Sequence, residues 1–435
     1  MKELTYEEIL DQIEHQRRFG NRPGAEVSAM MLEKLGRPQQ DMSVIHIAGT
    51  NGKGSVSAFL CSILKEAGIR TGMFTSPHLV DFRERICVDG QMISREDVVK
   101  LGNMLLGEKF EAVPAMFDYC LAMALLYYKK EQCQAAVIET GLGGRLDSTN
   151  AIGVPEVTVI TKIGYDHMAI LGDTLDKIAA EKAGIIKKGT KLVMESQKYE
   201  AMKVLLKTAE KEEVTEPKIA DLRDVTECRY ENGRQYFSYK KYRNLEMAML
   251  GVHQYENAAA AILAAEIFLR DRGISDGQAE YYIREGIRKT RWEGRMEILS
   301  TDPFLMVDGA HNGNGVAALA ESLCTLFPDE KFHFVMGVMA DKNYEEMIEE
   351  LLPLALDFKT VTVESERALA AQELSEKIRA RGICDTGILG SFEELMPDRL
   401  DVSHKTIAFG SLYFVGEIKK YFQDVTKITK SLQIY

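Results

Sequence analysis

In the first half of the chain, short runs of β-branched residues alternate with longer stretches of helical periodicity. Strands are predicted at 43–48, 135–139, 157–163 and 191–194, and helices are predicted from Ser55 and over 175–186. Strands that alternate with helical segments of about 10–15 residues indicate βαβ units. We therefore expect a mainly parallel sheet with helices on its faces.

The segment 225–249 has a different pattern. Tyr, Phe and charged residues alternate on both sides of Asn232-Gly233. An Asn-Gly pair between alternating strands is a strong signal for a two-residue turn. This segment predicts an antiparallel hairpin at an edge of the same domain.

A second series of strands follows two predicted helices, an Ala-rich one from Tyr255 to about Arg270 and another that ends near Lys289. Its strands are predicted at 304–307, 331–338, 359–363 and 406–409. The chain is therefore expected to hold two α/β domains, with a boundary near 291–299.

Composition sets limits on this picture. The chain has 435 residues, of which 28% are charged and 46% hydrophobic, as in an ordinary globular protein. Its 54 Lys and Arg against 66 Asp and Glu leave a net charge of −12. Such a charge argues against a protein that coats nucleic acid, although a local excess of donors can still bind an anionic small molecule.

No targeting or membrane signal is evident. The apolar stretches fall short of the roughly 20 residues that span a bilayer, and the N-terminus leads into an amphipathic segment, so a cytoplasmic location is expected. The 7 cysteines are scattered without a CxxC pair, which indicates reduced thiols and no zinc site built from them.

The strongest chemical signal is a glycine-rich loop between a predicted strand and a predicted helix. Glycines let backbone N–H groups surround an anion, a lysine reaches terminal phosphates, and a hydroxyl can meet Mg²⁺. The motif departs twice from G-x-x-x-x-G-K-[ST], because Ile47 holds the first glycine position and Gly54 follows the lysine. A glycine-rich turn with a solvated lysine is the alternative. The predicted cradle consists of Gly49, Thr50, Asn51, Gly52, Lys53, Gly54 and Ser55.

With these two departures, the segment Ala48–Ser55 resembles the nucleotide loop of the Mur ligase superfamily, particularly that of folylpolyglutamate synthase/dihydrofolate synthase. Further segments resemble that family in its order, and together they cover nearly the whole chain. The resemblance implies a P-loop-type ATP-binding central domain over 1–296, with folate-site loops and the edge hairpin, and a smaller Rossmann-like ligase domain over 297–435. The segments include Thr75–Leu79, Arg83–Ile86, Glu139–Asp147, Asp166-His167, Glu181–Lys187, Gly251–Gln254, Trp292–Arg295, Asp308–Asn312 and Gly410–Tyr413.

Phosphoryl transfer requires neutralisation of phosphate charge, usually by Mg²⁺ on hard oxygen ligands. Glu139 ends an apolar strand, where its carboxylate can face a metal; taken alone, it could equally be a surface or helix-capping acid. The resemblance adds Ser76 and His167 as companion ligands. Imidazole is less usual around Mg²⁺, and from chemistry alone His167 would be interpreted as a core histidine.

Lys182 lies in a predicted helix, where a solvated or salt-bridged lysine is the ordinary interpretation. In the family that the chain resembles, the lysine that matches Lys182 carries a carbamate formed with CO₂. That reaction needs the neutral amine, which a lowered pKa favours.

The remaining nucleotide contacts are also implied by the resemblance. Asn257 and Arg295 resemble ATP-contacting residues, Asp308 resembles a ribose-binding acid, and His311 follows closely. A strand-ending turn is the alternative for Asp308. These residues are expected on the far side of the domain boundary, so ATP is expected to join the two domains.

Substrate residues are implied by the same resemblance. His78 and Arg83 belong to a loop expected beside the pterin, Leu146, Asp147 and Ser148 match a segment that lines the pteroate site, and Phe117 is a further candidate. The sequence departs from the family at Asp118, Glu293, Gly313 and Asn343, which affects substrate preference more than reaction class.

The implied function is an ATP-dependent ligation of L-glutamate to folate through an acyl phosphate, with ADP and phosphate as products. Lys53, Lys182 and His311 are the expected catalytic residues, and a monomer is expected. Whether dihydropteroate is also a substrate stays open. We further expect a locally positive cleft built from Lys53, Arg83, Arg145, Arg295 and Mg²⁺.

Two alternatives remain. Another Mur-type ligase would join an amino acid to a UDP-linked sugar peptide, but it would lack the Ser-Pro-His-Leu and Arg-Glu-Arg-Ile segments. It would also need an N-terminal domain for which the 45 residues before His46 leave too little room. A non-catalytic P-loop regulator would bind nucleotide without ligase turnover.

Overall fold

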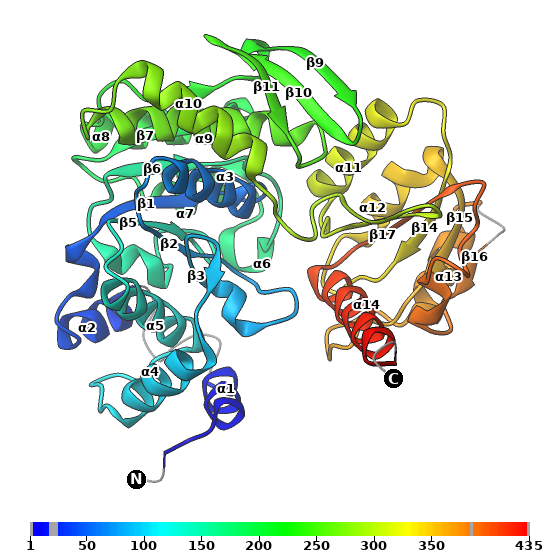
Figure 1. Cartoon of the computed structure of the whole chain (residues 1–435), viewed down its shortest axis with the longest axis horizontal. Coiled ribbons are helices and arrows are strands. Elements are labelled where there is room, and N and C mark those ends of the chain that lie inside the picture. The colour runs from blue at the N-terminus through cyan, green and yellow to red at the C-terminus, as the bar shows by residue number, and fades with distance from the viewer. Residues whose placement is uncertain (1–2, 17–24, 383–385, 433–435) are drawn as a thin grey trace. The chain divides into compact units, whose positions relative to one another are not determined.

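The computed structural model describes residues 3–16, 25–382 and 386–432. The chain folds into two compact units (Figure 1). Unit 1 comprises residues 1–248 and 254–290, and unit 2 comprises residues 249–253 and 291–435. Each unit is an α/β structure with its own central sheet, as the alternating pattern predicts.

The central sheet of unit 1 has eight strands in the order β4-β3-β2-β5-β1-β6-β7-β8. The six strands from β2 to β8 in this order pair in parallel, and β3 and β4 add an antiparallel edge that sequence reasoning missed. Prediction of the mainly parallel sheet is confirmed. The strands are β1 (Ser43–Ala48), β2 (Thr71–Phe74), β3 (Ile86–Val88), β4 (Gln91–Met92), β5 (Ala135–Glu139), β6 (Val157–Ile160), β7 (Lys191–Glu195) and β8 (Lys218–Ala220).

Helices cover both faces of this sheet, because side chains along a strand alternate between faces. Val44 of β1 packs into a cluster with α4 and α5, whereas Ile45 and Ile47, also buried, point to the face where α3 packs with α10. The described helices are α1 (Tyr6–Glu14), α2 (Glu26–Lys34), α3 (Lys53–Glu66), α4 (Arg95–Gly107), α5 (Met116–Lys130), α6 (Met168–Leu171), α7 (Leu175–Ala183), α8 (Tyr199–Lys211), α9 (His253–Arg270) and α10 (Asp276–Lys289), with 3₁₀ turns η1 (Pro38–Asp41), η2 (Phe82–Arg85), η3 (Ser148–Ile152) and η4 (Leu222–Asp224).

The predicted hairpin is antiparallel, and a third strand follows it. β9 (Val225–Glu231), β10 (Arg234–Tyr239) and β11 (Tyr242–Met247) form a sheet of their own. The turn between β9 and β10 holds Asn232 at φ 53° and Gly233 at φ 74°. Positive φ at both central residues is the requirement of the two-residue turn that Asn-Gly favours.

Unit 2 has a six-stranded sheet in the order β12-β13-β17-β14-β15-β16, parallel except for the edge strand β12. The prediction of a strand at 359–363 is wrong, because β15 begins at Ala355 and ends at Thr360. Its first residues are partly polar and partly exposed, so a search for runs of β-branched residues does not find them. The elements are β12 (Glu297–Thr301), β13 (Phe304–Asp308), β14 (Phe332–Met336), β15 (Ala355–Thr360), β16 (Thr386–Ile388), β17 (Lys405–Phe409), α11 (Gly313–Leu326), α12 (Tyr344–Leu351), α13 (Ala371–Arg379), α14 (Leu412–Leu432), η5 (Leu352–Leu354) and η6 (Phe392–Leu395).

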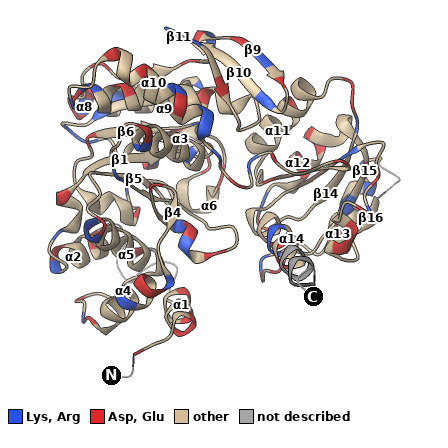
Figure 2. Ribbon diagram, viewed as in Figure 1, with Lys and Arg blue, Asp and Glu red and all other residues tan. Residues whose placement is uncertain are grey.

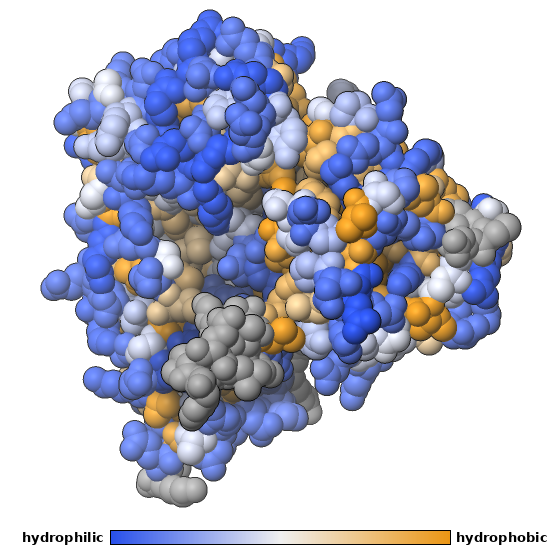
Figure 3. All heavy atoms as spheres, turned by 45° about the vertical axis from the view of Figure 1, so that its right-hand side comes forward, coloured by the Kyte–Doolittle hydropathy of each residue, from blue (hydrophilic) through white to orange (hydrophobic). Residues whose placement is uncertain are grey.

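The surfaces are those expected from the composition. Positive and negative side chains are interspersed along both units (Figure 2). On the face shown in Figure 3, hydrophobic residues are scattered in small groups among hydrophilic ones. Every described helix is too short or too polar to cross a lipid bilayer. The described cysteines are free thiols, four of them buried (Cys61, Cys87, Cys120 and Cys133), and Cys384 lies outside the described residues.

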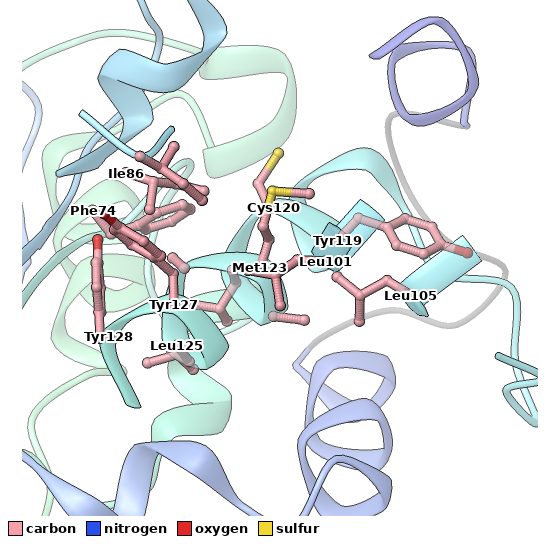
Figure 4. Close-up of a cluster of buried hydrophobic side chains, with 14 of the residues drawn as sticks. Phe74, Ile86, Leu101, Leu105, Tyr119, Cys120, Met123, Leu125, Tyr127 and Tyr128 are labelled. Atoms are coloured by element: carbon pink, nitrogen blue, oxygen red, sulfur yellow. The ribbon is translucent and has the colours of Figure 1, made fainter. Parts of the chain in front are cut away.

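The core beneath α5 supplies a test of packing. Leu125 of α5 is fully buried in a cluster with Phe74 and Ile86 (Figure 4), whereas Leu206 of α8 is 43% exposed. We expect Leu125→Ala to lower the free energy of unfolding by about 2–5 kcal/mol, because it leaves a cavity. Leu206→Ala, also a helical leucine, should change it by less than about 1 kcal/mol. Urea unfolding of the full chain measures both, and equal losses would contradict this assignment of the core.

Candidate functional site

The candidate residues of unit 1 gather at one edge of the sheet. β2, β5, β1 and β6 are adjacent and parallel, so the segments that follow them leave from the same edge. The chain runs from β1 to β2 on one side and later from β5 to β6 on the other. Ligands of open α/β sheets bind outside the carboxyl ends of strands where such a reversal occurs.

The glycine-rich loop connects the end of β1 to the start of α3. The backbone N–H groups of Thr50 and Asn51 donate to the Lys162 carbonyl at 2.8 and 3.3 Å. The hydroxyl of Thr161 donates to the Asn51 carbonyl at 2.7 Å. The loop is therefore tied to the segment after β6, and α3 begins at Lys53 with its N-terminal N–H groups at the loop.

Two glycines in this loop are sterically required. A Cβ on Gly49 would lie 1.8 Å from the Thr161 hydroxyl oxygen. Gly52 has φ +90°, and a Cβ there would lie 2.3 Å from Oδ1 of Asn257. The motif therefore allows close approach of the backbone to its neighbours. The expectation that Asn257 lies beyond the domain boundary is wrong, because it is buried on α9, which belongs to unit 1 from Gln254 onwards.

Lys53 and Glu139 form the charged centre of this edge. Nζ of Lys53 lies 3.8 Å from Oε1 of Glu139 and donates to the carbonyls of Gly49 and Thr50, each at 3.3 Å. Glu139 is the last residue of β5 and is buried. A carboxylate beside the lysine of a phosphate loop is a hard oxygen donor positioned where a divalent cation would meet phosphate.

Lys182 is buried against the same loop. Its amine donates to the Gly49 carbonyl at 2.7 Å from the last turn of α7. Burial, with the positive charge of Lys53, lowers its pKa to about 7, although Asp166 and Asp147 act in the opposite direction. A substantial fraction of this amine is neutral near pH 7, so it can act as a nucleophile towards CO₂.

The other predicted metal ligands follow neighbouring strands. Ser76 follows β2, beside β5, and His167 lies in the segment after β6 at φ 50°. The side chain of His167 is 42% exposed, and its Nε2 is 3.9 Å from Oδ1 of Asp166. Both residues thus lie in segments that leave from the same edge of the sheet as the glycine-rich loop.

The predicted substrate loop after β2 is held by its own charges. Glu84 accepts from the backbone N–H groups of Leu79, Val80 and Asp81. Arg83 is paired with Asp81 at 2.7 Å. Nε of Arg85 donates to Nδ1 of His78 at 2.8 Å, and burial together with that guanidinium lowers the pKa of His78 to about 4. His78 is therefore neutral at pH 7.

A buried carboxylate organises the second group of predicted substrate residues. Asp118 accepts from the hydroxyls of Ser148 and Ser28 at 2.7 and 2.5 Å, and from the Ala115 N–H at 2.7 Å. A Cβ on Gly141 would lie 2.7 Å from the ring of Phe117, the residue before Asp118. Asp118, one of the departures from the family, thus holds Ser148 in place by a hydrogen bond.

The remaining residues of this loop differ in exposure. Asp147 is buried and accepts from Leu142 N–H at 2.8 Å and from Thr149, so it closes the loop; burial raises its pKa. Leu146 is 47% exposed. Arg145 is paired with Glu181 at 2.7 Å. Arg83 and Arg145, expected to supply positive charge to a cleft, are therefore each neutralised by an acid.

In unit 2, the predicted residues lie where β13 ends. Asp308 accepts from Met296 N–H and Ala310 N–H, both at 2.8 Å, so a strand-ending turn is also present. Nη1 of Arg295 lies 2.3 Å from where a Cβ on Gly309 would be. His311 Nδ1 lies 2.8 Å from the Gly309 carbonyl oxygen. Arg295 and His311 thus both lie against Gly309, the residue that follows Asp308.

Sequence reasoning missed the role of the segment after β6. Thr161 and Lys162 hold the glycine-rich loop through the bonds described above, and Lys162 also pairs with the buried Glu256 at 2.7 Å. A signal was available, because these residues lie at the C-terminal end of the predicted strand 157–163, which was expected to be parallel to the strand at 43–48 and to end at the same edge.

Family models match both parts of the chain. Residues 47–265 match the Mur ligase middle domain, and residues 294–405 match the Mur ligase glutamate ligase domain. The first match includes the glycine-rich loop, Glu139 and Lys182, and the second includes Arg295, Asp308 and His311.

Full-length relatives agree with these models. The chain is 34% identical over 427 residues to the dihydrofolate synthase/folylpolyglutamate synthase of Bacillus subtilis, covering 96% of this chain and 99% of the relative. It resembles the structure of Thermotoga maritima folylpolyglutamate synthase with a TM-score of 0.79, 31% identity and 96% coverage of both chains. For the Mycobacterium tuberculosis folylpolyglutamate synthase complexed with ADP and AMPPCP, the TM-score is 0.82 at 29% identity, with 96% and 97% of the two chains covered. The chain therefore belongs to the Mur ligase family, in its folylpolyglutamate synthase/dihydrofolate synthase branch.

Proposed function

We propose that this protein ligates L-glutamate to a folate at the expense of ATP. The observation that carries the proposal is the convergence of a phosphate loop, the Lys53–Glu139 pair and the buried amine of Lys182 at one sheet edge. The names of full-length relatives, including the Lacticaseibacillus casei folylpolyglutamate synthase at 31% identity over 412 residues, support the same reaction. Dihydropteroate is a second candidate acceptor, because the Bacillus subtilis relative carries both names.

In the proposed reaction, the acceptor carboxylate attacks the γ-phosphorus of ATP, the bond to the bridging oxygen breaks, and ADP leaves. The amine of glutamate then attacks the acyl phosphate, and phosphate leaves from the tetrahedral intermediate. The N–H groups at the start of α3 and the amine of Lys53 bind the phosphate oxygens. No covalent protein nucleophile is needed, since the phosphoryl group activates the carboxylate.

The oxygen donors present fit Mg²⁺. Glu139 supplies a buried carboxylate and Ser76 a hydroxyl, while His167 is the nitrogen candidate. The bound ion would neutralise charge on the phosphate oxygens. A carbamate on Lys182, which its lowered pKa favours, would add negative charge near Asp166 and Asp147.

Residues of unit 2 complete the proposal. Arg295, with its planar guanidinium, is suited to phosphate, and His311 can donate to developing negative charge. The remaining lone pairs of Asp308 can accept from ribose hydroxyls. His78, Arg83, Phe117, Leu146, Asp147 and Ser148 are proposed for the folate side, with Asp147 acting through the loop that it closes.

The function is tested by release of ADP and phosphate with tetrahydrofolate and dihydropteroate side by side. We expect turnover that requires both a folate and glutamate. Lys53→Ala should lower the turnover rate by at least about 100-fold, because it removes the cationic side chain that binds the phosphate oxygens. Glutamate-independent turnover would contradict the mechanism. Turnover with a UDP-linked sugar peptide would indicate another Mur-type ligase, and nucleotide binding without turnover would indicate a regulator.

The amine of Lys182 gives a pH-dependent prediction. Because its pKa is about 7, the neutral form that reacts with CO₂ increases as pH rises through 7 and is lost below it. We expect a ¹³C carbamate signal after incubation with labelled bicarbonate, weaker at pH 6 than at pH 8, and its absence in Lys182→Ala together with loss of turnover.

Lys187 provides a matched control for this experiment. Burial also lowers its pKa, to about 8, but its amine donates to the carbonyls of Asn150 and Gly153. Lys187→Ala should retain the carbamate signal. A signal that survives in Lys182→Ala would disprove the assignment.

Glu139 gives a prediction about the metal. Glu139→Gln keeps the size of the side chain and removes its charge, so we expect the Mg²⁺ concentration needed for half-maximal turnover to rise by about 10-fold or more. Glu195→Gln is the control, because Glu195 is also a buried acid at the end of a parallel strand, β7. An unchanged Mg²⁺ requirement in Glu139→Gln would remove it from the ligand set.

A further inference from the structure

Unit 2 holds a cluster of two histidines and a carboxylate away from the residues discussed above. Nε2 of His333 lies 3.1 Å from Oδ2 of Asp401, and Nδ1 of His404 lies 3.2 Å from the same oxygen. The potential ligand atoms of the three residues all lie within 4.8 Å of one another. Two imidazole nitrogens thus converge on one carboxylate oxygen.

A second carboxylate orients His333. Its Nδ1 lies 2.9 Å from Oδ2 of Asp357, on the neighbouring strand β15, where the two residues are register partners. A histidine that donates one ring N–H to a carboxylate presents the other nitrogen, here Nε2, as a lone pair. Metal-binding histidines are commonly held by such an outer carboxylate.

Asp401 is oriented as well. Its Oδ1 accepts from the N–H and the hydroxyl of Ser403 at 2.9 and 2.6 Å, which leaves Oδ2 towards the histidines. Ser403 also lies 3.2 Å from Nδ1 of His404 and would have to yield that nitrogen to an ion.

The cluster lies at the end of the sheet opposite to the turn that holds Asp308. His333 is the second residue of β14, and Asp401 and His404 belong to the segment just before β17. Asp308, by contrast, is the last residue of β13, in register with the last residue of β17. Because these strands are parallel, the cluster and the proposed nucleotide residues leave from different edges.

We propose that His333, Asp401 and His404 bind a divalent transition-metal ion such as Zn²⁺, with Asp357 as the outer carboxylate. At Zn–ligand distances of about 2.0–2.2 Å, two ligands of a tetrahedral ion lie about 3.3–3.6 Å apart. Two of the three observed separations, 3.1 and 3.2 Å, are close to this range, and the third is within 4.8 Å. Water would complete the tetrahedron, since the three side chains are 25–45% exposed.

Charge balance favours the ion. Asp357 and Asp401 carry two negative charges, which a divalent cation and two neutral imidazoles would neutralise. Imidazole with carboxylate suits Zn²⁺, Ni²⁺ or Cu²⁺ better than Mg²⁺, which prefers oxygen. The ion would tie the segment before β17 to β14.

The test is titration of the full chain with Zn²⁺ in the presence of excess Mg²⁺. We expect one Zn²⁺ per chain and a higher midpoint of thermal unfolding with Zn²⁺. His404→Ala and the pair His333→Ala with His404→Ala should each lose that ion and the thermal shift. Asp357→Asn should weaken binding by about 10–100-fold, as expected for an outer carboxylate.

Three controls separate this site from other histidines and from a folding defect. His15→Ala removes an exposed histidine that pairs with Asp11, and His167→Ala removes the imidazole of the proposed nucleotide-site metal; both should retain the Zn²⁺. Without Zn²⁺, His404→Ala should unfold at nearly the wild-type midpoint and retain wild-type ligase turnover. Wild-type Zn²⁺ binding no stronger than that of His404→Ala, or its loss in His167→Ala, would overturn the proposal while leaving the ligase assignment intact.

Discussion

Parallel pairing of β1 with β5 on one side and β6 on the other is the constraint on which the functional part of unit 1 depends. It brings the ends of three strands, which are far apart in sequence, to one edge. The glycine-rich loop, Glu139 and the Thr161–Lys162 segment all leave from there. The backbone bonds from Thr50 and Asn51 to the Lys162 carbonyl are direct consequences of that register.

The same arrangement explains the unusual electrostatics of the site. Helix α7 returns across the sheet and places the Lys182 amine on the Gly49 carbonyl, where water is excluded. A protonated amine is costly in that position, particularly with Lys53 nearby, and its pKa falls. Burial therefore converts an ordinary helical lysine into a potential nucleophile. The site combines this amine with a buried acid, Glu139, and a phosphate loop.

Unit 2 repeats the use of a parallel sheet but places polar groups at both ends of its strands. Asp308 ends β13 and accepts from two backbone N–H groups, while Arg295 and His311 lie against the next residue, Gly309. This end matches the usual ligand edge of α/β sheets. The other end carries His333 between Asp357 and Asp401. A bound ion at the second position would act on the stability of unit 2, whereas the first belongs to the proposed ligase chemistry.

The sequence by itself determined the class of fold, most strands and the phosphate loop, because periodicity, glycine positions and local turn chemistry are properties of short segments. β1 and β5 have their predicted bounds, and Asn232-Gly233 forms its turn. Tertiary structure decided what depends on distant partners: the position of the half-polar β15, the loop-closing role of Asp147, the pairing of Arg83 and Arg145 with acids, and the meeting of His333 with Asp401 and His404. Burial and ion pairing arise between residues that the chain brings together only on folding, and a linear pattern contains no information on their distance.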